Sequence, residues 1–206
     1  MQENSDISKY KKGLRTKIVK TAMGFFTKRG VRAVTMDDVA HKLGISKRTI
    51  YELYETKEDL LYEVVVAHFK QRQVSMAKVL SRCNDVMEIL LEVYHQKVKD
   101  FKNTNPLFFS EMIRYPQLQQ FLNQQNQDMR QHSLDFYHRG VEEGYFRADV
   151  NYELAVSLFD VMGQYIMEQE LYRTYSIEDI FKNMVFVSVR GMCTERGVKA
   201  IDKILG

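Results

Sequence analysis

The chain is poor in residues that interrupt helices. Only two prolines, Pro106 and Pro116, occur among 206 residues. Because proline lacks an N–H and clashes with the preceding turn, its scarcity leaves long segments free to be helical. Apolar residues recur at helical spacing almost throughout, and no hairpin signal appears. The sequence therefore predicts an all-α protein of about nine helices. Two short helices begin at residues 35 and 46, and the others cover residues 8–29, 57–81, 85–101, 106–113, 117–143, 152–173 and 177–195.

Cysteines and long apolar runs are also scarce. Cys83 and Cys193 are far apart and match no metal-binding or redox spacing. The most apolar stretch, residues 60–67, contains Glu63 and is much shorter than the roughly 20 residues of a membrane helix. The N-terminus is polar and acidic, unlike a signal peptide. We expect a cytoplasmic protein with no membrane partner, no bound metal and no cofactor.

Sequence motifs of enzymes are missing as well. There is no His-Glu-x-x-His pair, no phosphate-binding glycine loop, no nucleophile elbow and no cluster of Cys and His. The five histidines, at 41, 68, 95, 132 and 138, lack metal-ligand spacing. We therefore do not expect an enzyme. A ligand-independent DNA-binding or architectural protein remains an alternative at this stage.

Charge is unevenly distributed along the chain. The net charge is +3, yet residues 1–57 carry 13 Lys and Arg against 6 Asp and Glu. The remainder of the chain carries 17 against 21. A basic N-terminal segment on a mildly acidic body indicates contact with a polyanion, whereas the simpler explanation is a set of solvated lysines.

Residues 35–57 have the pattern of a helix-turn-helix. Thr35 and Asp38 have the spacing of a capping box, which predicts the start of one helix. Gly44 permits the positive backbone angle of a sharp interhelical turn, and Ser46 caps the next helix. Ile50 anchors that second helix, which leaves outward-facing residues Lys47, Arg48, Thr49 and Tyr51.

These side chains have the chemistry that DNA recognition needs. Arg48 and Lys47 can donate to guanine edges or phosphates, and Thr49 can contact a base edge or a thymine methyl. Tyr51 can donate its phenol to a phosphate. Lys57 lies in the first turn of the following helix, beside free backbone N–H groups, and is predicted to clamp a phosphate.

The segment from Phe26 to Leu60, which includes Gly-Ile-Ser-Lys-Arg-Thr-Ile-Tyr at 44–51, resembles the DNA-binding domain of the tetracycline-repressor (TetR) family. The resemblance covers about residues 14–65. It departs from the family pattern at Leu53, where an aromatic residue or His is common, and at Tyr54, where Phe is common. It implies DNA contacts by Thr35, Ser46, Lys47, Thr49, Tyr51 and Lys57.

The resemblance also implies how the rest of the chain is organised. We expect a helix-turn-helix domain at residues 1–56 and a helical regulatory domain at 57–206. Members of the family typically sense small molecules, so aromatic and Met side chains of the body are candidates for a pocket. The residues predicted to line it are Phe69, Tyr94, Phe101, Phe108, Met112, Phe121, Met129, Phe136 and Tyr137.

The last two predicted helices carry apolar residues on more than one face. A helix buried on one side only does not need this pattern, so we expect a core face and a homodimer face. Residues 144–155 also resemble the family's entry into its first dimer helix. The predicted interface residues are Phe159, Met162, Tyr165, Ile166, Phe181, Met184, Val185 and Met192.

Together these features predict a ligand-responsive transcriptional regulator, and they favour a repressor over an activator. It would bind a near-palindromic double-stranded DNA operator as a homodimer, and a small-molecule effector would release it. The sequence does not identify the effector, the operator or the target genes.

Overall fold

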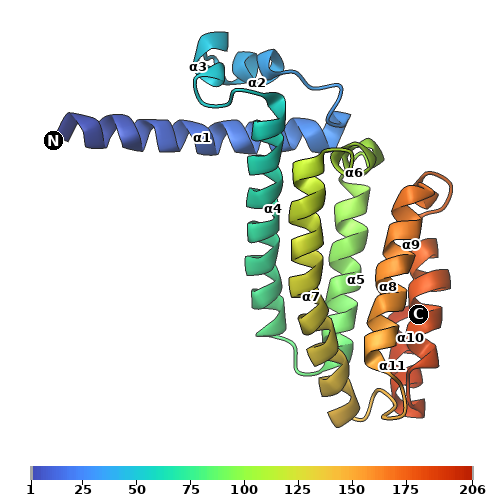
Figure 1. The fold of residues 1–206 in the computed structure, drawn as a ribbon. Coiled ribbons are helices and arrows are strands. Elements are labelled where there is room, and N and C mark those ends of the chain that lie inside the picture. The colour runs from blue at the N-terminus through green and yellow to red at the C-terminus, as the bar shows by residue number, and fades with distance from the viewer. Residues whose placement is uncertain (1, 206) are drawn as a thin grey trace. The chain divides into compact units, whose positions relative to one another are not determined.

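The computed structural model describes residues 2–205 and confirms the predicted all-α class, because every regular element among them is helical (Figure 1). One isolated bridge joins Phe146 to Cys193. No helix of the described residues is long and apolar enough to cross a membrane. The helices are α1 (Gln2–Arg29), α2 (Met36–Leu43), α3 (Lys47–Tyr51), α4 (Lys57–Leu80), α5 (Val86–Lys102), α6 (Pro106–Met112), α7 (Pro116–Glu142), α8 (Tyr152–Glu168), α9 (Ile177–Ile180), α10 (Phe186–Gly191) and α11 (Glu195–Leu205).

Two predicted helix boundaries near the C-terminus are wrong. Helix α8 ends at Glu168, and a short 3-10 turn at Leu171–Arg173 follows it. The prediction for 177–195 missed the final helix α11, which starts after a turn at Met192. Tertiary hydrogen bonds hold that turn, since the Arg147 N–H donates to the Met192 carbonyl at 2.9 Å. Such a partner cannot be inferred from local sequence.

The chain divides into two compact units. Unit 1 comprises the chain up to Val74 together with Leu107–Gln119, and unit 2 comprises Ser75–Pro106 and the chain from Gln120 onward. The three boundaries between the units fall within helices, since α4, α6 and α7 each contribute residues to both units. The functional boundary between residues 56 and 57 stays a prediction.

Unit 1 is built on one face of α1. Leu14, Ile18, Ala22 and Phe26 recur every fourth residue and are all buried, so they form one apolar stripe along the helix. Phe25 beside it is only partly buried, and the Arg29 guanidinium covers its ring at 4.2 Å from the centroid. The stripe fixes α1 as the base on which the following short helices pack.

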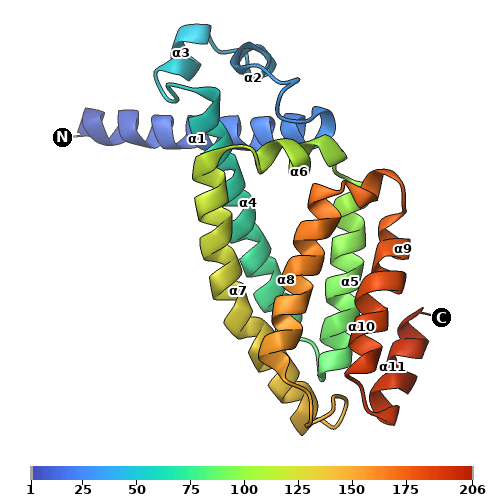
Figure 2. The same cartoon turned by 45° about the vertical axis from the view of Figure 1, so that its right-hand side comes forward.

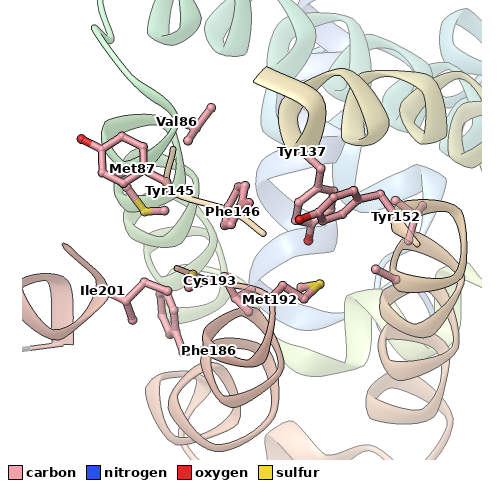
Figure 3. Close-up of a cluster of buried hydrophobic side chains, with 13 residues drawn as sticks. Val86, Met87, Tyr137, Tyr145, Phe146, Tyr152, Phe186, Met192, Cys193 and Ile201 are labelled. Carbon is pink, nitrogen blue, oxygen red and sulfur yellow. The ribbon is translucent and has the colours of Figure 1, made fainter. Parts of the chain in front are cut away.

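Unit 2 has an aromatic core. The Tyr137 ring lies 5.3 Å from Phe146 and stacks on Tyr152 at 5.0 Å between centroids (Figure 3). A Cβ on Gly140 would lie 2.1 Å from the Phe146 ring, so only glycine allows this approach. Figure 2 shows α5, α8 and the α9–α10 segment side by side in this unit. A π turn, Phe181–Val185, joins α9 to α10 without a break.

Candidate DNA interface

A reciprocal cap fixes the start of α2. The Thr35 hydroxyl accepts from the Asp38 N–H at 3.1 Å, and the Asp38 carboxylate accepts from the Thr35 N–H at 2.8 Å. The predicted capping box is therefore confirmed. Hydrogen bonds from the Thr35 backbone and hydroxyl hold the pKa of Asp38 below its usual value. Both orphan donors are satisfied locally, so the start of α2 does not depend on distant contacts.

The turn into α3 follows the predicted chemistry. Gly44 has φ of 64°, the left-handed conformation that glycine adopts at little cost. Ser46 then caps α3, because its hydroxyl accepts from the Thr49 N–H at 3.0 Å. Ile50 is completely buried and holds the helix against unit 1. With its start capped and its inner face anchored, α3 presents a fixed outer face.

That outer face carries exposed cations in weak ion pairs. Lys47 Nζ lies 2.9 Å from an Asp37 carboxylate oxygen, and this hydrogen bond raises the pKa of Lys47. Arg48 Nε lies 2.8 Å from Glu52, and the Arg48 side chain is 88% exposed. Exposed pairs of this kind add little to stability, because solvent screens them. Both cations can therefore exchange their carboxylate for a phosphate or a base edge at little cost.

Lys57 holds the loop between α1 and α2. Its ammonium donates to the carbonyls of Val31 and Val34, each at 3.1 Å, and its side chain is partly buried. An ammonium group has three N–H donors, so two of them act within the protein. The predicted phosphate clamp is left with the third donor and with the first turn of α4. Lys57 thus has a structural task that its position in the motif did not indicate.

Glu111 of α6 holds the same loop from another direction. Its carboxylate accepts from the Arg32 N–H at 2.8 Å, and the residue is only 9% exposed. Gly30 has φ of 83°, and a Cβ there would lie 3.0 Å from the Glu111 carboxylate and 3.0 Å from the Leu107 Cβ. Sequence reasoning missed Glu111, because it lies 79 residues from its partner and belongs to no local motif.

The structure brings the predicted DNA contacts together in unit 1. Lys47, Arg48 and Tyr51 are exposed on α3, and the caps Thr35 and Ser46 are exposed at the helix starts. Thr49 is partly buried, since its hydroxyl bonds that of Ser46 at 2.8 Å. This is an exposed basic helix beside two helix N-termini, a geometry suited to phosphates and to the major groove.

A family model described as bacterial regulatory proteins, tetR family, matches residues 18–64, which span α2 and α3 and parts of α1 and α4. The HTH-type transcriptional repressor KstR2 of Rhodococcus jostii (strain RHA1) is 25% identical over 158 residues, 73% of this chain and 76% of that protein. Residues 18–64 are thus a DNA-binding segment of the TetR type, and the chain is similar to HTH-type repressors over about three quarters of its length. The family and these relatives are regulators and not enzymes.

Solved structures show the same fold. A transcriptional regulator from Saccharomonospora viridis, solved in complex with choline, superposes with a TM-score of 0.71 at 20% identity, covering 89% of this chain and 100% of that one. The ketosteroid transcriptional regulator KstR2 of Mycobacterium tuberculosis gives 0.59 at 18% identity, covering 88% and 95%. The helical body of this chain thus shares the fold of these two regulators outside the matched segment.

The predicted pocket residues are distributed over both units. Phe69, Phe108 and Met112 belong to unit 1, and the other six belong to unit 2. Tyr137 is buried in the aromatic core, and this burial raises its pKa. Met129, in contrast, is 53% exposed. Their role in ligand binding stays a prediction.

The predicted dimer residues face in different directions. Met192 is buried in the core of unit 2, and Phe159, Phe181 and Val185 pack against that core. Tyr165 is 51% exposed, whereas Met162, Ile166 and Met184 are partly buried. The exposed large apolar side chains of α8 share only Tyr165 with this prediction, and we call them the α8 stripe: Leu154, Leu158, Val161 and Tyr165. The spacing of the four α8 members was readable from the sequence.

Proposed function

We propose that this protein is a TetR-family repressor that binds a near-palindromic operator as a homodimer and is released by a small molecule. The observation that carries the proposal is the fixed, exposed outer face of α3. Ser46 and Ile50 hold that helix, and Lys47 and Arg48 lie exposed on it in exchangeable pairs. A recognition helix needs both properties, because base contacts require a fixed register and exposed donors.

The α8 stripe supports the homodimer. Leu154, Leu158, Val161 and Tyr165 follow one another at intervals of four, three and four residues, and each is more than half exposed. This is the spacing of a helix that packs lengthwise on another helix. A two-fold axis would place two copies of α3 in successive major grooves, which lie roughly 34–36 Å apart on one face of B-DNA.

Repression and ligand response rest on the relatives. The curated relatives are named transcriptional repressors, and one structural neighbour was solved with choline. For a ligand to act, it must bind the DNA-free form more tightly than the DNA-bound form. We place that coupling along α4, which begins at the DNA-reading segment and continues into unit 2.

The first experiment is selection of bound fragments from the source genome, followed by measurement of affinity and stoichiometry on the selected site. We expect a near-palindromic site occupied by two protomers. Arg48→Ala should change the base preference at one position of each half-site. Selection of fragments with no common sequence would favour an architectural protein and contradict the proposal.

The second experiment tests release by a ligand. Choline and a ketosteroid, chosen because of the named neighbours, are the first probes in a panel of small organic molecules. An active compound should lower operator affinity and change amide hydrogen exchange along residues 57–81. Release without any change in exchange over this segment would contradict coupling through α4.

A further inference from the structure

The first half of α1 is strongly basic. Between Asp6 and Asp37 the chain contains no acidic residue, although 27 acids among 206 residues would place about four there. The same segment contains nine cations: Lys9, Lys11, Lys12, Arg15, Lys17, Lys20, Lys28, Arg29 and Arg32. Solvated surfaces normally mix charges of both signs, so this segment differs from an ordinary exposed helix.

The basic side chains at the start of the helix are available to a partner. Residues 9–13 are exposed on all sides of α1, and Leu14, which follows them, is buried. Lys9, Lys11 and Lys12 form no ion pair with the described part of the chain, in contrast to Arg15, which pairs with Glu63 at 2.7 Å. Lys17 and Lys20 are also exposed and unpaired within that part.

These turns have little intrinsic reason to remain helical. A helix that is polar on all sides usually needs pairs of opposite charge for its stability. Here Lys9 and Lys12 are separated by three residues and Lys11 and Arg15 by four, so neighbours on the helix surface repel each other. Gly13 lowers the helix propensity further. A bound polyanion would remove the repulsion.

The basic turns lie close to the recognition helix within unit 1. The Arg15 guanidinium lies 4.9 Å from the centre of the Tyr54 ring, and α3 ends three residues earlier at Tyr51. Lys9 is six residues before Arg15, which corresponds to about 9 Å along a helix axis. Figure 1 shows α3 over the middle of α1, the part of the helix that contains Arg15.

We infer that residues 9–20 form a second DNA-binding surface, the α1 arm, which contacts the phosphate backbone beside the groove read by α3. The inference rests on the proposed function, because it extends the same protein–DNA interface. The arm carries lysines and no base-reading pattern, so it adds affinity without sequence preference. The α1 arm becomes ordered when it binds DNA, because the DNA phosphates supply the negative charge that the arm itself lacks.

The test compares two triple variants of the full-length protein on the selected operator. The arm variant is Lys9→Gln, Lys11→Gln and Lys12→Gln, and the control is Lys182→Gln, Lys199→Gln and Lys203→Gln, three exposed lysines of unit 2. Both remove three positive charges, and Gln has nearly the helix propensity of Lys. The readouts are operator affinity against salt concentration and phosphate ethylation interference.

The arm variant should lower the magnitude of the salt slope by about 1 to 3 units per protomer, since each phosphate contact contributes about 0.9. It should lose interference at one or more phosphates and keep the wild-type base preference. The control should change neither. In wild-type protein, amide exchange over residues 9–13 should slow when operator DNA is added.

Equal effects of both variants would show that the three arm lysines act only through the overall charge of the protein. That result would overturn the inference. An arm variant with the wild-type salt slope that no longer binds phosphatidylglycerol vesicles would assign the arm to a membrane surface instead. If wild-type protein binds no DNA at all, the proposed function fails together with the arm. If wild type binds and the arm variant matches it, the inference alone fails.

Discussion

The hydroxyl of Tyr54 is buried without a hydrogen-bond partner among the described residues. The residue is 3% exposed and lies directly after α3, beside the ion pair of Arg15 and Glu63. Burial raises the pKa of Tyr54, which therefore stays protonated at neutral pH. A buried hydroxyl that makes no hydrogen bond loses its hydration and gains nothing in return.

We predict that Tyr54→Phe leaves stability unchanged or raises it by up to about 1 kcal/mol, because it removes an unsatisfied polar atom and keeps the ring. The matched control is Tyr145→Phe. The Tyr145 hydroxyl donates to Asp85 at 2.8 Å and accepts from Arg196 at 3.1 Å. Its loss should destabilise by about 1 to 2 kcal/mol. Urea unfolding of both variants measures the difference, and a Tyr54→Phe protein less stable than Tyr145→Phe would contradict the prediction.

The cap of α2 should respond to acid. Asp38 has a lowered pKa in the folded protein, so its stabilising effect is complete above the ordinary value of 3.8 and is lost as pH falls through the lower, folded value. We expect the Thr35 and Asp38 amide resonances to shift together in that acidic range. In Asp38→Asn, which keeps an acceptor oxygen and does not titrate, the shift should be absent. Titration of Asp38 at or above its ordinary value would contradict the assigned capping box.

At the scale of elements, the loop between α1 and α2 has partners on two helices. Lys57 of α4 holds two of its carbonyls, and Glu111 of α6 holds its Arg32 N–H. Glu111 belongs to residues 107–119 of unit 1, and the residues before and after this segment in the chain belong to unit 2. The loop leads directly into Thr35 and α2, so its geometry bears on where α2 and α3 lie within unit 1.

We predict that Glu111→Ala weakens operator binding by about 5- to 20-fold, because an unmade hydrogen bond to a charged group costs roughly 1.5 to 3 kcal/mol and only part of this affects binding. Glu111→Gln keeps an acceptor for the Arg32 N–H and should retain most of the affinity. Exchange of the Arg32 amide should be fast in the Ala variant and slow in the Gln variant. The salt slope should stay constant in both, and a fall in slope would instead indicate a lost phosphate contact.

At the scale of the whole molecule, the α8 stripe is the surface that we propose for the homodimer. Four large apolar side chains along one helix, each more than half exposed, form the kind of patch that marks an interface. We predict that Leu158→Glu converts the dimer to monomer and weakens operator binding at least 100-fold, since a charge buried without a partner costs several kcal/mol. Sedimentation equilibrium and operator titration measure the two effects.

The control for this prediction is Leu80→Glu, which places the same charge at an exposed apolar residue outside α8. It should leave the oligomeric state unchanged. A Leu158→Glu protein that remains dimeric would show that dimerisation uses another surface, and a wild-type protein that is monomeric on DNA would contradict the homodimer.

The sequence by itself determined the features that depend on neighbouring residues. The all-α class, the caps at Thr35 and Ser46 and the turn at Gly44 all follow from interactions within four residues along the chain. The exposed outer face of α3 follows in the same way, once Ile50 is assigned to the core. Local hydrogen bonds and helical periodicity need no knowledge of the rest of the protein.

Only the tertiary structure decided features that join distant residues. Glu111 meets Arg32, the Lys57 ammonium turns to the loop carbonyls, and a bridge to the Met192 turn separates α10 from α11. It also showed that Met192 faces the core while Leu158 faces outward, although both are apolar and both lie in segments that the sequence predicts to be helical. Which apolar face is covered depends on what packs against it, and that is a property of the folded chain.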